Sequence, residues 1–126
     1  MAKKMIFPED LVLQRLAQLG LLITNSVVIP EEFKKQLLKE YLFLRLDISL
    51  WMSYKGSGLC QRYLDGSTHR LLHMKQIMKS QLRSPNQRRG FYESLYEIQY
   101  QVEMLLKSTR DISLNFSKNI QSSNYS

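Results

Sequence analysis

The segment from residue 91 to residue 112, FYESLYEIQYQVEMLLKSTRDI, decides the fold. Mostly apolar residues recur along it in alternating steps of four and three, at Phe91, Leu95, Ile98, Val102, Leu105, Thr109 and Ile112. This heptad-like spacing places them on one side of an α-helix and is typical of helices that pack against other helices. Ser84 and Pro85, upstream of the segment, are typical of a helix N-cap followed by the first helical residue. The segment therefore predicts a long amphipathic helix in a helical bundle.

Three earlier segments show the same helical period. Pro8 and Pro30 are each followed by two acidic residues, a pattern typical of a first helical turn. Proline is tolerated there, and acidic side chains favour the positive end of the helix dipole. The two starts predict helices over residues 8–25 and 30–55, and apolar spacing predicts a third over residues 59–82.

The composition indicates a single helical domain. A chain of 126 residues is long enough for one core, and five glycines and three prolines are few for the many turns of an all-β fold. Because the connections are short, consecutive helices should be antiparallel neighbours. The expected fold is an all-α, up-down-up-down antiparallel four-helix bundle over residues 1–112. From Ser113 the chain is rich in serine and asparagine, which predicts a flexible tail over residues 113–126.

The cysteine content and the N-terminus bear on location. Cys60 is the only cysteine, so no intramolecular disulfide can form. The basic start is followed by Pro8 and two acids instead of the apolar run of a secretory signal. No segment reaches the roughly 20 apolar residues of a membrane span. We therefore expect a cytoplasmic protein with no membrane partner.

The net charge of +7 is concentrated in the third quarter of the chain. Residues 55–90 contain eight lysines and arginines against one acidic residue, Asp65, whereas the rest of the chain holds ten basic and ten acidic residues. At about 100° per residue, Arg62, His73 and Arg83 share one side of the predicted third helix, opposite its apolar side. The charge therefore forms a local basic face.

A basic helical face suits a nucleic-acid backbone, because phosphate contacts release counterions and need no particular base. The predicted nucleic-acid-binding residues are Arg62, His69, Arg70, His73, Lys75, Lys79, Arg83, Arg88 and Arg89. Arg88 and Arg89 precede the fourth helix, where cations oppose the helix dipole, so helix stability does not explain them. Two other interpretations stay open: an acidic protein docks on this face, or the face is merely solvated. No base-reading motif is present, so RNA and DNA are not distinguished.

Neither metal binding nor catalysis is indicated. His69 and His73 have the i, i+4 spacing that can bind a metal on a helix, but the sequence offers no third ligand and no HExxH glutamate between them. The carboxylates stand singly among basic residues or at helix starts, and the sequence has no nucleophile elbow, no phosphate-binding glycine loop and none of the Glu-x-x-His pairs of di-iron bundles. We expect a protein without a cofactor that is not an enzyme. A helical subunit of an enzyme whose active site lies on another chain is a weaker alternative.

The second predicted helix has more apolar surface than one buried side requires. Besides its core side it carries Leu42, Phe43, Leu46 and Leu50. An exposed apolar stripe is typical of an interface, so these residues predict self-association as a dimer or a closed ring. Another stripe, on the fourth helix, consists of Tyr92, Tyr96 and Tyr100. These tyrosines fit either base stacking or packing at the edge of the core.

In helix order and length the chain resembles a small four-helix-bundle family. That family includes Avd, the accessory variability determinant of diversity-generating retroelements, and the proteins encoded in intervening sequences of large ribosomal RNA genes. The resemblance covers roughly residues 11–110. It lies in the Ile-Pro break at residues 29–30, in Arg-Tyr-Leu-Asp at 62–65 and Leu-His-Met at 72–74 of the basic third helix, and in FYESLYEI at 91–98.

The resemblance implies a basic protein that assembles as a pentameric barrel and serves a reverse transcriptase by binding it together with its template RNA. The basic face would then hold RNA or DNA phosphates, and the apolar stripe of the second helix would lie between subunits. The chain departs from the family at residues 106–109, where Leu-Lys-Ser-Thr stands in place of frequent glycines. A protein-interaction module that binds an acidic partner, such as a phage or plasmid regulator or an immunity-like protein, is the alternative function.

Overall fold

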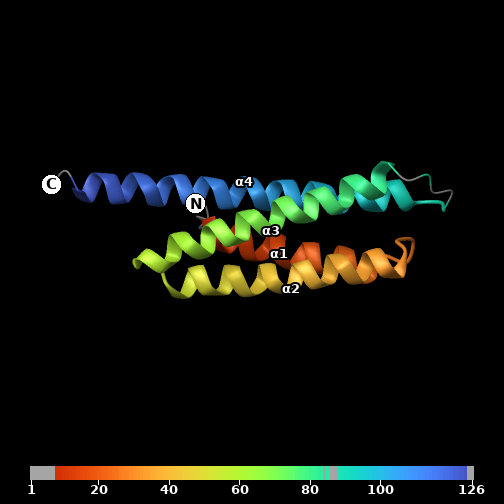
Figure 1. The fold of residues 1–126 in the computed structure, drawn as a ribbon, viewed down its shortest axis with the longest axis horizontal. Coiled ribbons are helices and arrows are strands. Elements are labelled where there is room, and N and C mark those ends of the chain that lie inside the picture. The colour runs from red at the N-terminus through yellow and green to blue at the C-terminus, as the bar shows by residue number, and fades with distance from the viewer. Residues whose placement is uncertain (1–7, 84, 86–87, 125–126) are drawn as a thin grey trace, which may run out of the picture.

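The computed structural model describes residues 8–83, residue 85 and residues 88–124, with side chains up to residue 115. It contains helices α1 (Pro8–Asn25), α2 (Glu31–Ser53), α3 (Gly58–Arg83) and α4 (Phe91–Asn124) (Figure 1). These described ranges contain no strand, so the predicted all-α class is confirmed. None of the described helices is long and apolar enough to cross a lipid bilayer.

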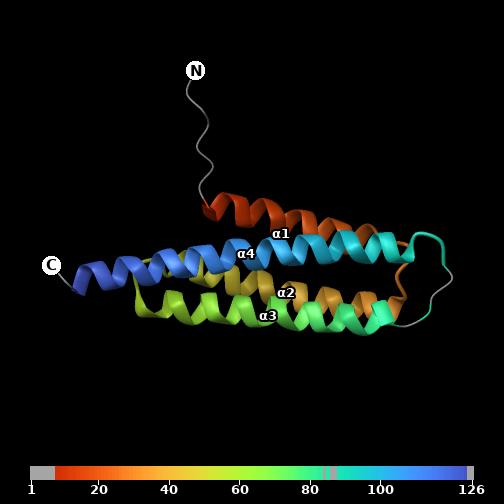
Figure 2. The same ribbon diagram turned by 90° about the horizontal axis from the view of Figure 1, so that it is seen from above.

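The helices form the predicted up-down-up-down antiparallel bundle. α2 packs between α1 and α3, and α4 closes the bundle by packing against both α3 and α1 (Figures 1 and 2). The contact between α1 and α2 is the smallest of the four. There the two helices come close at Gly20, where a Cβ atom would lie 2.6 Å from Cζ of Tyr41.

One hydrophobic core is shared by all four helices. Its largest fully buried side chains include Leu19, Leu37, Trp51, Leu71, Met74 and Phe91. The periodic positions of α4 are buried as predicted, except that Ile112 is half-buried. Thr109, the polar member, donates its hydroxyl to the carbonyl of Leu105 at 2.8 Å, so its burial leaves no unpaired donor.

α4 begins later than predicted. Pro85 is not helical, and α4 starts at Phe91, whose N–H donates to the carbonyl of Arg88 at 3.1 Å. Gly90 has φ of +83°, a left-handed conformation that interrupts a right-handed helix and that glycine adopts without steric cost. The predicted helix start at Pro85 is therefore wrong, and its N-cap, Ser84, lies outside the described residues.

The C-terminal end of α4 extends past the ends of the other three helices (Figures 1 and 2). Its helical backbone continues to Asn124, beyond Ile112, where the periodic pattern ends. In the predicted flexible tail, residues 113–126, the backbone is helical to Asn124, whereas the side chains from residue 116 onward and all of residues 125–126 lie outside the described part of the chain.

Candidate nucleic-acid interface

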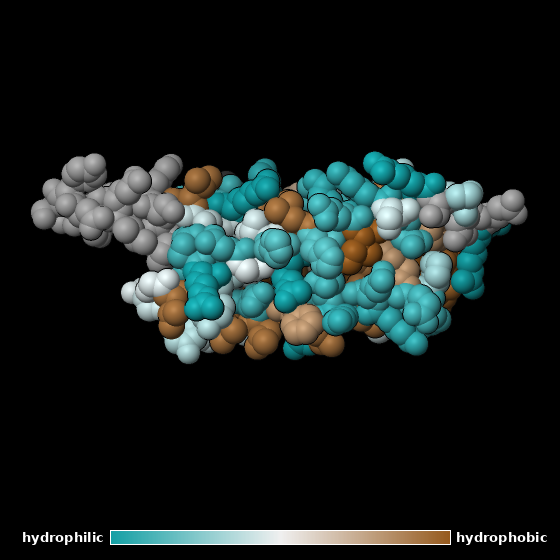
Figure 3. All heavy atoms as spheres, in the orientation of Figure 1, coloured by the Kyte–Doolittle hydropathy of each residue, from teal (hydrophilic) through white to brown (hydrophobic). Residues whose placement is uncertain are grey.

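The outer side of α3 and the connection after it carry the predicted basic face. The exposed members are Arg62, His69, His73, Lys79, Arg83, Arg88 and Arg89. Arg70 and Lys75 are half-buried. The surface over α3 is mostly hydrophilic (Figure 3). All of the predicted residues therefore lie on or directly after one helix, but their surroundings differ.

Glu40 of α2 engages two of the predicted residues. Its Oε2 accepts a hydrogen bond from Nη1 of Arg70 at 3.2 Å, and its Oε1 lies 3.2 Å from Nδ1 of His73. The guanidinium of Arg70 also stacks 4.6 Å from the centroid of the Phe43 ring. The side chain of Glu40 is only 10% exposed, so its charge requires these partners. Arg70 and His73 therefore join α3 to α2, and a phosphate near them would compete with a carboxylate.

On its other side α3 is joined to α4 by polar contacts. Nζ of Lys75 lies 2.6 Å from Oε1 of Glu103. Gln61 donates from Nε2 to Oδ1 of Asp65 at 2.9 Å and to the hydroxyl of Ser113 at 3.0 Å. Lys75 is thus engaged in the contact between α3 and α4, and a ligand phosphate would have to compete with Glu103 for it.

Four of the remaining cations have no acidic partner among the described residues. Arg62, Lys79, Arg83 and Arg89 form no ion pair within the part of the chain that the structure describes. Lys79, Arg83 and Arg89 lie with Arg88 where α3 ends and α4 begins, at the right-hand end of Figure 1, and we call these four the α3–α4 cluster. Arg62 stands apart, roughly 25 Å back along α3 at 1.5 Å per residue.

The described residues include no metal-binding cluster, because no group of three or more His, Cys, Asp or Glu side chains among them is placed to hold a metal ion. Cys60 is buried with Sγ 3.4 Å from the carbonyl of Trp51, and desolvation raises the pKa of its thiol, which keeps it protonated. Burial also raises the pKa of the Asp47 carboxyl, against the opposing charge of Arg70.

The predicted oligomer-interface residues form an exposed stripe on α2. Leu42, Phe43 and Leu46 are 60%, 41% and 55% exposed, and Leu50 is half-buried. We call these four residues the α2 stripe. Leu42, Phe43 and Leu46 border a shallow depression that Lys35 and Lys39 also line. Hydrophobic side chains gather along the lower edge of the molecule, over α2 (Figure 3).

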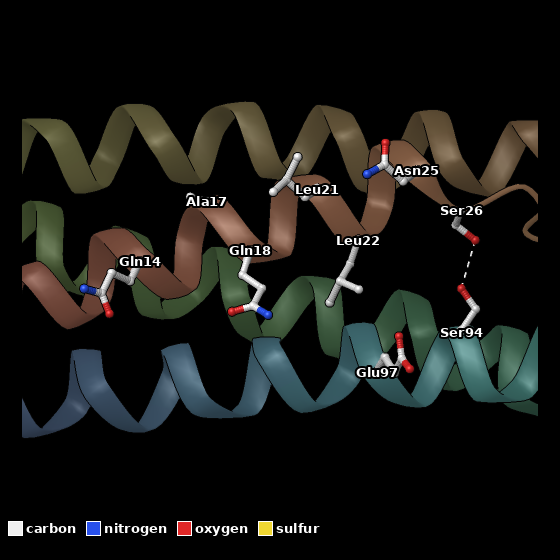
Figure 4. A pocket seen from close by; sticks show the side chains of 9 residues that line it. All are labelled: Gln14, Ala17, Gln18, Leu21, Leu22, Asn25, Ser26, Ser94 and Glu97. Atoms are coloured by element: carbon white, nitrogen blue, oxygen red, sulfur yellow. Dashed lines mark hydrogen bonds between the residues drawn. The ribbon is translucent and has the colours of Figure 1, made fainter.

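A groove between α1 and α4 was not predicted from the sequence. Its main part has a volume of about 590 Å³ (Figure 4). Gln18 and Leu22 point from α1 toward α4, and the Ser26 and Ser94 hydroxyls, 2.8 Å apart, join the helices at one end. It is lined by Gln14, Ala17, Gln18, Leu21, Leu22, Asn25, Ser26, Ser94 and Glu97. Three of the lining side chains are small, Ala17, Ser26 and Ser94, which is a signal that sequence analysis could have used.

The tyrosines of α4 divide into two kinds. Tyr96 and Tyr100 are each 58% exposed and line a continuation of the groove with Leu22. Tyr92 is half-buried, with its ring centroid 5.1 Å from that of Phe91 in an edge-on arrangement. Only Tyr92 therefore packs at the edge of the core.

The comparisons with known proteins leave these surfaces without an assignment. Scans against protein-family models, curated proteins and solved structures found no match. The interpretation of the site therefore depends on its own residues and their geometry.

Proposed function

We propose that the chain is a non-catalytic accessory protein that binds nucleic-acid phosphates through Arg62 and the α3–α4 cluster. One observation carries this proposal: the exposed cations Arg62, Lys79, Arg83 and Arg89 have no acidic partner in the described part of the chain. Arg70, His73 and Lys75 have such partners, so we assign them mainly to helix packing.

The shape of the surface favours a phosphate backbone over a small ligand. The cations lie on the outer side of a helix and in a connection, and none of them lines the α1–α4 groove or the depression beside the α2 stripe. Cations on an open surface bind phosphates by releasing counterions, without selecting a base. We therefore expect weak sequence preference and no distinction between RNA and DNA at these contacts.

The family resemblance supplies a context for this binding. An Avd-like protein would hold the template RNA while it contacts a reverse transcriptase, and it would act as an oligomer. The α2 stripe supports self-association, because three of its four side chains are exposed. An acidic protein partner is the competing occupant of the basic surface, and the following experiment separates the two.

The test compares two triple variants with the same net charge. The site variant carries Lys79→Gln, Arg83→Gln and Arg89→Gln. The control carries Arg45→Gln, Lys107→Gln and Arg110→Gln, three exposed cations on α2 and α4. Affinity for a generic single-stranded RNA and for a hairpin RNA is measured by fluorescence anisotropy at low salt.

We expect the site variant to bind about 10- to 100-fold more weakly. Each phosphate contact that is lost leaves its counterions on the RNA, so the favourable entropy of their release no longer contributes to affinity. The control should retain most of its affinity, because its cations lie elsewhere. Equal weakening in both variants would mean that net charge alone attracts RNA. Unchanged binding in the site variant would sink the proposed site and favour a protein partner.

A further inference from the structure

Two apolar surfaces remain unpartnered, and they share no helix. The α2 stripe is one, and the groove between α1 and α4 is the other. In the groove Leu21 is 61% exposed, which matches the 60% exposure of Leu42 on the stripe. Since exposed apolar patches mark interfaces, each surface is a candidate docking surface.

The α2 stripe is poorly suited to pair with a copy of itself. Lys35 and Lys39 border it, and Arg45 is exposed on the same helix. A two-fold contact that pairs the two α2 helices in parallel would bring these cations together, because each residue then faces its own counterpart. Like charges in such a contact oppose association.

The groove has the complementary character. The sole charged side chain among those that line it is Glu97, and it lines both parts of the groove. The other lining groups are apolar or uncharged, including Leu21, Leu22 and the amide of Gln18. Tyr96 and Tyr100 extend the wall, and tyrosine is enriched at protein interfaces. An apolar helix flanked by lysines fits this acidic-edged groove.

We propose that the α2 stripe of one copy docks into the α1–α4 groove of the next copy. Leu42 and Leu46 stand one turn apart and form a ridge, and packing of a helix ridge between two helices is the ordinary geometry of helix association. Lys35 or Lys39 would approach Glu97. This inference rests on the self-association part of the proposed function and names the surface that receives the stripe.

A contact between two different surfaces is heterologous, so it propagates from copy to copy and closes into a ring if the rotation permits. α3 lines neither surface, and its contact with the stripe is the stacking of Arg70 on Phe43. The α3–α4 cluster lies at the end of α3 and belongs to neither surface, so assembly would multiply the cations available to one nucleic acid.

Three single substitutions with nearly equal exposure test the docking. Leu42→Asp changes the stripe, Leu21→Asp changes the groove, and Leu114→Asp is the control, since Leu114 is 61% exposed and outside both surfaces. Sedimentation velocity without nucleic acid measures the assembly. We expect wild type and control to assemble, and each of the other variants to be monomeric at the same concentration.

The decisive sample is an equimolar mixture of Leu42→Asp and Leu21→Asp. Each variant keeps the surface that the other lacks, so the mixture should form heterodimers and stop there. Assembly of Leu21→Asp at wild-type strength would overturn the proposal and indicate a stripe-to-stripe contact. A mixture that stays monomeric, or a monomeric wild type, would also overturn it. RNA binding by these samples is scored separately, so failure of the docking is distinguishable from failure of the basic site.

Discussion

Glu40 shows how one residue changes the interpretation of a basic face. The sequence identifies the cations of α3, but Glu40 lies 30 positions before Arg70, and no helical spacing connects them. Lys75 and Glu103 are likewise far apart in sequence and meet only through the packing of α3 on α4. The residue types at the site could therefore be predicted, whereas their pairing required the fold.

At this scale we expect Glu40→Gln to lower the free energy of unfolding by about 1–2 kcal/mol, because it removes the charge that Arg70 and His73 share in a half-buried contact. Chemical denaturation measures the change. Glu32→Gln is the matched control on the same helix, since Glu32 is 93% exposed and lies 4.0 Å from Lys35. The control should change stability by less than about 0.5 kcal/mol. Equal effects would mean that the Glu40 contact contributes nothing particular.

At the scale of the helices, apolar periodicity predicted all four helices, whereas the exact residue at which a helix begins was harder to predict. α1, α2 and α3 begin and end within a few residues of the predicted bounds, because apolar spacing and proline starts act locally. The start of α4 was mispredicted, since Pro85 and Gly90 give competing signals and the left-handed conformation of Gly90 prevails. The groove between α1 and α4 depends on how two helices meet, which no single helix encodes.

One contact between helices should respond to pH. Glu9 lies at the start of α1 and Lys55 lies just after the end of α2. The Glu9 carboxylate accepts a hydrogen bond from Nζ of Lys55 at 2.7 Å, and this bond lowers the pKa of the Glu9 carboxyl. Because the carboxyl has a lower pKa in the folded state than in the unfolded state, it contributes stability when the pH is above its unfolded-state pKa. That contribution is lost as the pH falls through its folded-state pKa.

Wild type should therefore lose more stability between about pH 6 and about pH 3 than Lys55→Gln does. Thermal unfolding across this range measures the difference. The two profiles should converge at the acidic end, where Glu9 is protonated in both proteins. Parallel profiles throughout the range would contradict the assignment to this pair.

For the whole molecule, the number of unpaired cations sets the salt dependence of binding. If Arg62, Lys79, Arg83 and Arg89 each neutralise one phosphate of a duplex, log K should fall with log salt with a slope of about −3.6. This slope corresponds to about 100-fold weaker binding between 50 mM and 200 mM salt. Titrations at several salt concentrations, with a monomeric variant, measure it. A slope near zero would exclude phosphate contacts as the source of affinity.

The acids on either side of α3 have a further consequence for alignment. Glu40 holds α3 from α2, and Glu103 holds it from α4. A rotation of α3 about its axis, or a slide by one turn, would separate both pairs at once. Four of the six buried side chains of α3, Leu64, Leu71, Met74 and Met78, are close in volume, so their packing distinguishes a shifted register less sharply than the two charge contacts do. The ion pairs thus favour one register of α3 among those that apolar packing allows, and they fix the direction in which its outer side faces.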